Sequence, residues 1–379
     1  MVGLAASSAL SPFCVAHWHA SSGDPPKLRR SVSIIVILAV AGLAYLSTGW
    51  SARPRVLCLV NGRPLSPLAG EGRWVAWLEG DGKERRLVLA PRSGRRPRTV
   101  LTGAGLSGLA VSGESAYVTR AEAGGGAELL EISLPGGGTK TIAELSEGAD
   151  QLTCSGGWLV WQKSRPAGVL GVPFVAAAAP VTVVRARPVA EGPVRVVAVV
   201  SGEGGASNDG FELLGAAGDR AYWIERSPAS QRTWVRRAPC AGGATETIAE
   251  EQGLRRAALG GEVLVWTGPS LEAGRAQSFA SVKRMNVGKG GADAIADWLG
   301  TGTAVMISDG QAYAQERGSL WRLGERRGEQ RRLSVGPPGL MSARVIGDEE
   351  VMFLEGAGGS AVAKRPLTAW ARLRAMVGG

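Results

Sequence analysis

Residues 218–223, Gly-Asp-Arg-Ala-Tyr-Trp, show the pattern that decides the fold: a glycine turn, then a short apolar strand that ends in a large aromatic side chain. The pattern recurs at 72–77 (Gly-Arg-Trp-Val-Ala-Trp), 113–118 (Gly-Glu-Ser-Ala-Tyr-Val), 156–161 (Gly-Gly-Trp-Leu-Val-Trp) and 261–266 (Gly-Glu-Val-Leu-Val-Trp), with weaker copies at 309–314 and 348–353. The copies are spaced at about 40 to 48 residues, the length of a four-stranded propeller blade, with one longer interval between Trp161 and Trp223.

The residues around each copy supply the other strands of a blade. A short apolar strand precedes the glycine, as at 106–111, 211–214 and 304–307, and the glycine suits a tight hairpin turn. A third strand, a glycine-rich turn and a fourth strand follow, with close agreement between 132–144, 237–250 and 284–297. We therefore predict an all-β fold, a β-propeller of about seven four-stranded blades over residues 53–367, with six blades as the alternative.

The two ends of the repeat region suggest how the ring closes. Residues 55–60 form a lone strand before the first full unit, and the last unit stops at Leu367 after its third strand. The simplest arrangement is that the N-terminal strand completes the last blade. This predicts that Val56 to Leu59 pair with Ala361 to Lys364.

The longer interval contains a run of small residues, 168–180, and then two valine-rich stretches, 181–184 and 194–200. The run is too short to cross a membrane, so we expect an inserted loop on one propeller face. The tryptophans should fill the spaces between blades. This is the preferred interpretation of Trp74, Trp158 and Trp223, against a floor on which a ligand stacks.

An uncharged segment, residues 31–52, precedes the repeats and is long enough to span a bilayer. Lys27, Arg29 and Arg30 stand before it, so the positive-inside rule places the N-terminus in the cytoplasm and the propeller outside, in the periplasm or the extracellular space. We predict a signal-anchor helix, with a cleaved signal peptide as the alternative. Residues 1–30 are expected to be a disordered cytoplasmic tail, and residues 368–379 a tail or short helix.

One copy of the repeat resembles a known family. Residues 221–225, Ala-Tyr-Trp-Ile-Glu, followed by 235–244, Val-Arg-Arg-Ala-Pro-Cys-Ala-Gly-Gly-Ala, are similar to the unit of YWTD propellers and of TolB-like bacterial propellers, although no copy carries the Thr-Asp of the full motif. The resemblance extends over roughly residues 55 to 367. Such relatives mostly bind proteins or act as scaffolds, so the resemblance implies binding.

The sequence excludes several chemistries from the part after residue 19, because that part contains no histidine. Ser-His-Asp and Cys-His nucleophile systems and histidine-ligated metals are thereby ruled out there, and no Walker or dinucleotide motif appears. We predict no catalytic, cofactor-binding or metal-binding residue. Glu225, Asp297 and Asp309 lie near strand ends and are the carboxylates considered for a channel site, with surface charge as the preferred interpretation of each. Residues 208–210, Asn-Asp-Gly, are expected to form a turn and not a calcium loop.

Cysteine and arginine usage adds two expectations. Cys14, Cys58, Cys154 and Cys240 have no metal or redox spacing, and one disulfide among the last three is left open. The net charge is +10, with adjacent arginines at 85–86, 95–96, 236–237, 255–256, 326–327 and 331–332. Such a chain attracts polyanions, but the pairs are scattered among repeats, which favours solvated strand edges and loops.

The function predicted from these observations is binding. We expect a membrane-tethered, extracytoplasmic propeller that binds a protein or an acidic envelope polymer or acts as a scaffold, with membrane contact through residues 31–52 and no specific nucleic acid. The alternative is a glycan-active enzyme with two carboxylates in the central channel, about 5 to 10 Å apart.

Overall fold

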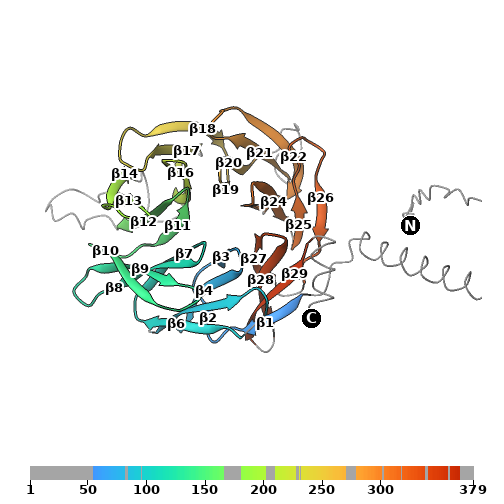
Figure 1. The fold of residues 1–379 in the computed structure, drawn as a ribbon. Coiled ribbons are helices and arrows are strands. Elements are labelled where there is room, and N and C mark those ends of the chain that lie inside the picture. Colours follow the sequence, from blue (N-terminus) through green and yellow to red (C-terminus); the bar gives the residue numbers. More distant parts are fainter. Residues whose placement is uncertain are drawn as a thin grey trace, which may run out of the picture. The chain divides into compact units, whose positions relative to one another are not determined.

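The computed structural model describes residues 54–367, except 82–83, 95, 166–180, 202–209, 228–229, 231, 270–278, 301–302, 317, 338–339 and 357–358. Seven antiparallel sheets stand in a ring (Figure 1), which confirms the all-β propeller and its seven blades. Among the described residues, no helix is long and apolar enough to cross a membrane. The predicted anchor, residues 31–52, the tail 1–30 and the C-terminal segment 368–379 lie outside the described residues.

Every blade contains four strands in meander order, and the first blade contains an additional short strand. The first blade consists of β2 (Arg63–Pro64), β3 (Ala69–Glu71), β4 (Trp74–Gly80), β5 (Arg85–Pro91) and β6 (Arg98–Gly103). The second to fourth blades consist of β7 (Leu106–Ser112), β8 (Ser115–Ala121), β9 (Ala127–Ser133) and β10 (Thr139–Leu145); β11 (Gln151–Ser155), β12 (Trp158–Arg165), β13 (Val181–Pro188) and β14 (Arg195–Ser201); and β15 (Phe211–Ala217), β16 (Arg220–Ser227), β17 (Arg232–Pro239) and β18 (Glu246–Gln252).

The fifth and sixth blades consist of β19 (Ala257–Gly260), β20 (Val263–Pro269), β21 (Phe279–Asn286) and β22 (Ala292–Gly300), and of β23 (Ala304–Ser308), β24 (Gln311–Glu316), β25 (Ser319–Arg322) and β26 (Arg331–Ser334). The seventh blade combines β27 (Leu340–Ile346), β28 (Glu349–Gly356) and β29 (Gly359–Pro366) with β1 (Arg55–Leu59) from the start of the propeller. In the third blade, β13 and β14 are the two valine-rich stretches of the long interval. The insert is therefore limited to residues 166–180.

The glycine of the repeat has the conformation that its hairpin turn needs. Gly72, Gly113, Gly218 and Gly261 all have φ values of 57° or 58°, the left-handed region that the first position of a tight turn between twisted strands requires. The seventh copy of the repeat begins one residue earlier than position 348, where the comparison of the repeats had placed its start. Ile346 pairs with Glu349, so the turn starts at Gly347 and not at residue 348.

The predicted closure of the ring is confirmed. In β1, Val56 pairs with Ala363 and Leu59 pairs with Ala361 of β29, with a bulge between Val56 and Cys58. The first-made strand of the propeller thus completes its last blade. Because the chain ends of the ring belong to one sheet, hydrogen bonds and not only side-chain packing hold the ring shut.

The hydrophobic core lies between neighbouring blades, as the tryptophans predict. Trp77, Trp161, Trp223 and Trp266, one from each of four blades, are completely buried. Each core cluster combines residues of adjacent blades, for example Leu87 of β5 with Leu106 of β7. Apolar area buried in this way contributes roughly 25 cal/mol per Å². The ring is therefore stabilised at every junction and not at one central core.

One blade junction carries a buried ion pair. Glu350 of β28 and Arg365 of β29 are 0% and 2% exposed, and Arg365 Nε donates to Glu350 Oε2 at 2.6 Å. Arg365 also donates to Ser334 Oγ of the sixth blade at 2.8 Å and to the Val335 carbonyl at 2.6 Å. This arrangement, the Glu350 clasp, connects the seventh blade to the sixth.

Candidate functional site

The meander order places the connections of every blade at two ends of the ring. The second hairpin of each blade and the connections between blades lie at one end, which we call the loop face. The first and third hairpins lie at the opposite end, the turn face. The three longest connections that leave described strands, 166–180, 202–210 and 270–278, all belong to the loop face. Long connections on one end of a rigid scaffold are where binding sites are usually built.

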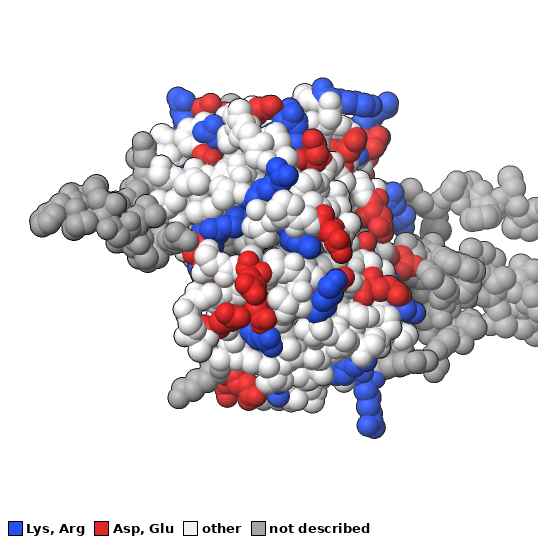
Figure 2. Space-filling view, turned by 60° about the vertical axis from the view of Figure 1, so that its left-hand side comes forward, with Lys and Arg blue, Asp and Glu red and all other residues white. Residues whose placement is uncertain are grey.

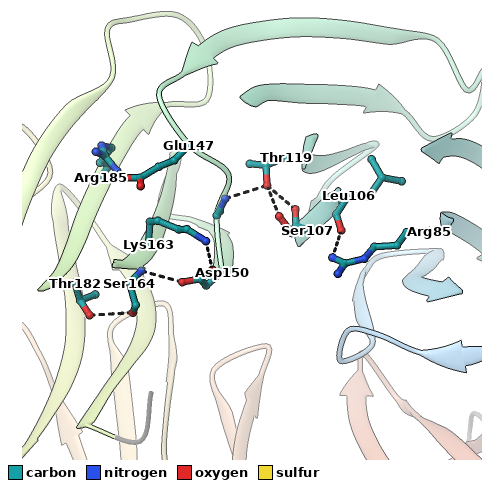
Figure 3. Close-up of polar contacts among 11 residues, drawn as sticks. Arg85, Leu106, Ser107, Thr119, Glu147, Asp150, Lys163, Ser164, Thr182 and Arg185 are labelled. Carbon is teal, nitrogen blue, oxygen red and sulfur yellow. Dashed lines mark hydrogen bonds and ion pairs between the residues drawn. The ribbon is translucent and has the colours of Figure 1, made fainter. Parts of the chain in front are cut away.

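The hairpin of β12 and β13 is held at the loop face by polar contacts from the connection before β11. The carboxylate of Asp150, in the connection before β11, accepts hydrogen bonds from Lys163 Nζ (2.6 Å) and from the Ser164 main-chain nitrogen (2.8 Å) (Figure 3). Asp150 also donates its own main-chain N–H to the Gln162 carbonyl at 2.9 Å. The last strand pair of this hairpin, Arg165 with Val181, is the point from which residues 166–180 depart.

A second set of contacts braces the same hairpin from the side. Glu147 Oε1 lies 2.9 Å from Arg185 Nη1, and Ser164 Oγ lies 3.0 Å from Thr182 Oγ1 (Figure 3). The buried Thr119 hydroxyl of the second blade accepts the Ala149 N–H at 3.1 Å. We call the group Glu147, Asp150, Lys163, Ser164, Thr182 and Arg185 the hairpin stem. Contacts from the second and third blades hold the hairpin stem, so it is a fixed base for the hairpin of β12 and β13.

The hairpin stem was not identified from the sequence, although the repeat contains a signal for it. Two residues after the buried tryptophan, the first and fourth blades have Glu79 and Glu225, and each accepts the tryptophan indole N–H at 2.8 Å. The third blade has Lys163 at this position, which binds Asp150 instead. The indole nitrogen of Trp161 is accordingly buried without a partner. A lysine at a position where other copies carry an acid is the sequence signal that this position makes a different contact in the third blade.

The centre of the ring is closed in by the first strands of the blades. A Cβ added at Gly70 would lie 2.4 Å from Ile346 Cδ1, and one added at Gly260 would lie 2.4 Å from Ile307 Cγ2. Neighbouring first strands therefore approach more closely than side chains at these positions would allow. Gln151 Nε2 of β11 even reaches the Leu213 carbonyl of β15 at 2.8 Å.

Few charged groups border the channel. The described first strands carry three: Glu71, Glu212 and Arg344. Glu71 accepts the Gly113 N–H and lies at the turn-face end of β3, whereas Glu212 is near the loop-face end of β15 and binds a neighbouring arginine. Arg344 is reached by solvent, but it also donates to the Leu68 carbonyl at 3.3 Å, and the strands around its side chain displace part of its water. This desolvation lowers the pKa of its guanidinium, while nearby Glu71 raises it. The two carboxylates lie in different blades and at opposite ends, so they do not form a pair.

The carboxylates considered from the sequence are not brought together either. Glu225 is at the loop-face end of β16, where it binds Trp223 Nε1 and lies 3.3 Å from Arg236 Nε. Asp309 is in the first hairpin of the sixth blade, at the turn face, with φ of 49°. Asp297 is in β22, and its side chain is not described. The two carboxylates whose side chains are described therefore have local roles: Glu225 binds a tryptophan, and Asp309 is part of a turn.

The tryptophans considered as a ligand floor belong to the packing between blades. Trp223 is fully buried, and its ring stacks on Phe211 at 6.4 Å. Trp74 and Trp158 are half-buried against core clusters. The guanidinium of Arg73 lies 5.6 Å from the Trp74 ring. The interpretation as inter-blade packing fits all three positions.

The three cysteines in the described part of the chain, Cys58, Cys154 and Cys240, are free thiols in three different blades. Burial raises the pKa of Cys58 and Cys154 to about 11 each, and that of Cys240 to about 12. Such thiols are poor nucleophiles at neutral pH. In the described ranges, no group of histidine, cysteine and acidic side chains has the geometry to hold a metal ion. Of the Asn-Asp-Gly turn, residues 208 and 209 lie outside the described residues.

The arginine pairs are distributed over the blades and are engaged locally. Arg85 donates to the Leu106 carbonyl at 2.7 Å, Arg237 pairs with Glu246 at 2.8 Å, and Arg332 donates to Ser319 Oγ at 2.8 Å. Figure 2 shows basic and acidic side chains interspersed over the face it presents. Interspersed charge weakens a long-range attraction to polyanions.

Comparison with known proteins identifies a fold and no family. No family model matches the chain, and no curated protein matches it. Solved structures similar to it include an acylaminoacyl peptidase in complex with Z-Gly-Gly-Phe-chloromethyl ketone (TM-score 0.57, 13% identity, 82% of this chain and 53% of that one). The β-propeller domain of the Trilobed protease from Pyrococcus furiosus has a TM-score of 0.54, with 17% identity over 82% and 96% of the two chains. An oligogalacturonate lyase in complex with manganese has a TM-score of 0.56, with 12% identity over 83% and 92%.

These likenesses show the propeller fold alone, because all the identities are below 20%. The chain spans about half the length of the acylaminoacyl peptidase structure that it matches. TolB from Acinetobacter baumannii is also a structural neighbour, with a TM-score of 0.42 and 12% identity over 80% of this chain and 66% of TolB.

Proposed function

We propose that this chain is a membrane-tethered binding module whose propeller captures a protein outside the cytoplasm through the loop face around the hairpin of β12 and β13. The observation that carries this proposal is the hairpin stem. Asp150 and Glu147 hold the two strands of this hairpin through Lys163, Ser164 and Arg185, at the base of one of the longest connections of the loop face. A rigid base lowers the entropy that a binding segment loses when it engages a partner.

The charges of the surface favour a protein over an acidic polymer. Arg185 and Lys163 of the hairpin stem each face a carboxylate, at 2.9 and 2.6 Å, so neither is a free cation for a polyanion. The net charge of +10 still supports weak, salt-dependent attraction to acidic chains. Oligogalacturonate, which the name of one structural neighbour suggests, is therefore a useful acidic probe in the same test.

The tether is proposed from residues 31–52, an uncharged stretch with basic residues before it. Its test is fractionation of cells that express the full chain. An anchored chain stays with membranes after alkaline carbonate, and protease added from the outside digests the propeller. A chain that appears in the soluble fraction with a new N-terminus near residue 52 would show the cleaved signal peptide instead.

Binding is tested by deleting the insert. Residues 166–180 are replaced by Asn-Gly, a two-residue turn that closes Arg165 onto Val181. The matched control replaces residues 270–279, at the second hairpin of the fifth blade, by the same turn between the paired residues Pro269 and Ala280. Both variants should keep the circular dichroism spectrum of a β-propeller, so that folding is not in question.

The readout is affinity capture from envelope extract at 0.1 M and 1 M salt, with mass spectrometry of the proteins retained. We expect one set of proteins to be retained at high salt by the parent and by the control, and lost with residues 166–180. Equal capture by all three would contradict a role for this hairpin. Retention at low salt alone, together with binding of oligogalacturonate, would indicate a polyanion binder.

A further inference from the structure

The strand that closes the ring also fixes where the chain enters the propeller. The predicted anchor ends at residue 52 and β1 begins at Arg55, so residues 53 and 54 alone separate them. The three Cα–Cα steps from residue 52 to Arg55 span at most about 11 Å. Arg55 pairs with Lys364, near the end of β29 that leads to the turn face, whereas Leu59 pairs with Ala361 near the loop face. The chain therefore enters at the turn face.

Basic side chains gather beside this entry point. The third hairpin of the first blade, between β5 and β6, reaches β1, because a Cβ added at Gly94 would lie 3.8 Å from Arg55 Nη2. We call Arg55, Arg92, Arg96 and Arg98 the entry corner. The exposed members are Arg55 and Arg96.

The entry corner has an excess of positive charge. Arg92 pairs with Glu349 at 2.9 Å and lies 3.5 Å from Asp348. Arg98 donates to the Leu134 and Pro135 carbonyls and lies 5.9 Å from the centre of the Trp74 ring, and no described carboxylate pairs with it. No ion pair with a carboxylate forms at Arg55 or Arg96 among the described residues, and both face solvent. Arginine charges without an acidic partner cost little free energy in water. Beside an anionic surface the same charges are attracted, which is favourable.

We infer that the entry corner rests on anionic phospholipid headgroups next to the anchor, so that the turn face lies toward the bilayer and the loop face points away from it. This inference rests on the proposed tether. Lipid, and not an acidic polymer, is the partner because a link of two residues keeps Arg55 within about 11 Å of the point where the anchor emerges, comparable to the Debye length of about 10 Å at 0.1 M ionic strength. Each arginine near an anionic leaflet contributes about 1 kcal/mol.

The test uses the full chain in nanodiscs, made either of phosphatidylcholine alone or with 30% phosphatidylglycerol. One fluorescent reporter is placed on the turn face by S93C and another on the loop face by Q252C, both at exposed positions. Each is made in a C14S background, and the parent without added cysteine measures labelling of the other thiols, which is slow because burial raises their pKa. Acrylamide, a neutral quencher, measures how accessible each reporter is from water.

We expect the reporter at 93 to be quenched several-fold more slowly than that at 252 in phosphatidylglycerol discs, and the difference to shrink in phosphatidylcholine discs or in 1 M salt. Loss of two arginine contacts at about 1 kcal/mol each changes the ratio of docked to undocked propeller about 30-fold. R55E/R96E should therefore abolish the effect of phosphatidylglycerol. The matched control R63E/R256E changes the same charge on exposed loop-face positions and should leave it intact.

Two results would overturn the inference: equal shielding of the reporter at 93 in both kinds of disc, or stronger shielding of the reporter at 252. A chain that does not enter the discs at all would show that the tether itself fails. That outcome is recognised separately, because the protein then elutes without lipid.

Discussion

The Glu350 clasp gives a sharp test of how the ring is held between its sixth and seventh blades. Glu350→Leu should lower the free energy of unfolding by about 3 to 5 kcal/mol, the range for removing one partner of a buried ion pair. Arg365 would keep two neutral acceptors, Ser334 Oγ at 2.8 Å and the Val335 carbonyl at 2.6 Å, and would lose the carboxylate. The free energy of unfolding of native proteins is only about 5 to 15 kcal/mol in total, so this loss would be a large fraction of it.

Two variants separate charge from packing at the same site. Glu350→Gln keeps the side-chain volume and an acceptor oxygen, so it should cost less than Glu350→Leu. Glu350→Leu with Arg365→Met removes both charges and should be more stable than Glu350→Leu alone. The assay is urea unfolding followed by tryptophan fluorescence and far-UV circular dichroism. A loss below about 1 kcal/mol for Glu350→Leu, or a double variant less stable than the single one, would refute this account of the junction.

Three further predictions concern other parts of the ring. Asp150→Asn should lower hydrogen-exchange protection of the Ser164 amide about tenfold or more, because a charge-assisted bond of about 1.5 to 3 kcal/mol is weakened; exchange in β16 should not change, and loss of protection there would mean global destabilisation. A chain that starts at residue 61 lacks β1 and should melt several degrees lower than one that starts at residue 53, as measured by circular dichroism; equal melting would argue against closure through β1. Burial, with a smaller effect of Asp219, raises the pKa of Cys240 from 9.0 to about 12, so the native thiol keeps a proton that the unfolded thiol loses. Stability is then complete below about pH 9 and falls as the pH rises towards 12, and Cys240→Ala should reduce this loss in urea midpoints measured from pH 8 to 11; an unchanged slope would contradict it.

The blades and their closure could be predicted because both depend on local signals. A glycine such as Gly218 must adopt a positive φ to make its hairpin turn, and the aromatic residue five positions later must be buried. The lone strand at 55–60 and the incomplete unit before Leu367 then leave one simple way to complete a blade. The alignment of the seventh copy was wrong by one residue, because its acid at 348 was matched to Asp309 while the glycine beside it occupies the turn position.

The hairpin stem could not be predicted because its contacts cross between strands whose register the sequence does not state. Asp150 binds Lys163 only because the connection before β11 crosses the end of β12 at that residue. The first strands of the blades are also difficult to recognise from the sequence. They carry small residues where neighbouring blades touch, such as Gly70 and Gly260, and lack the aromatic side chain that marks the second strands. The predicted anchor and the C-terminal segment stay predictions.

Closure by β1 has a consequence for the order in which the molecule is made. Val56 and Leu59 leave the ribosome about 300 residues before their partners in β29. Compared with a five-residue hairpin, closing a loop about 60 times longer adds about 3.6 kcal/mol of entropy. Until synthesis reaches residue 366, β1 is a short apolar strand with no edge to pair with, and the first six blades can form without it. The seventh blade is therefore the last step of folding, and the interval before it is when this chain depends most on protection from pairing with the wrong strand.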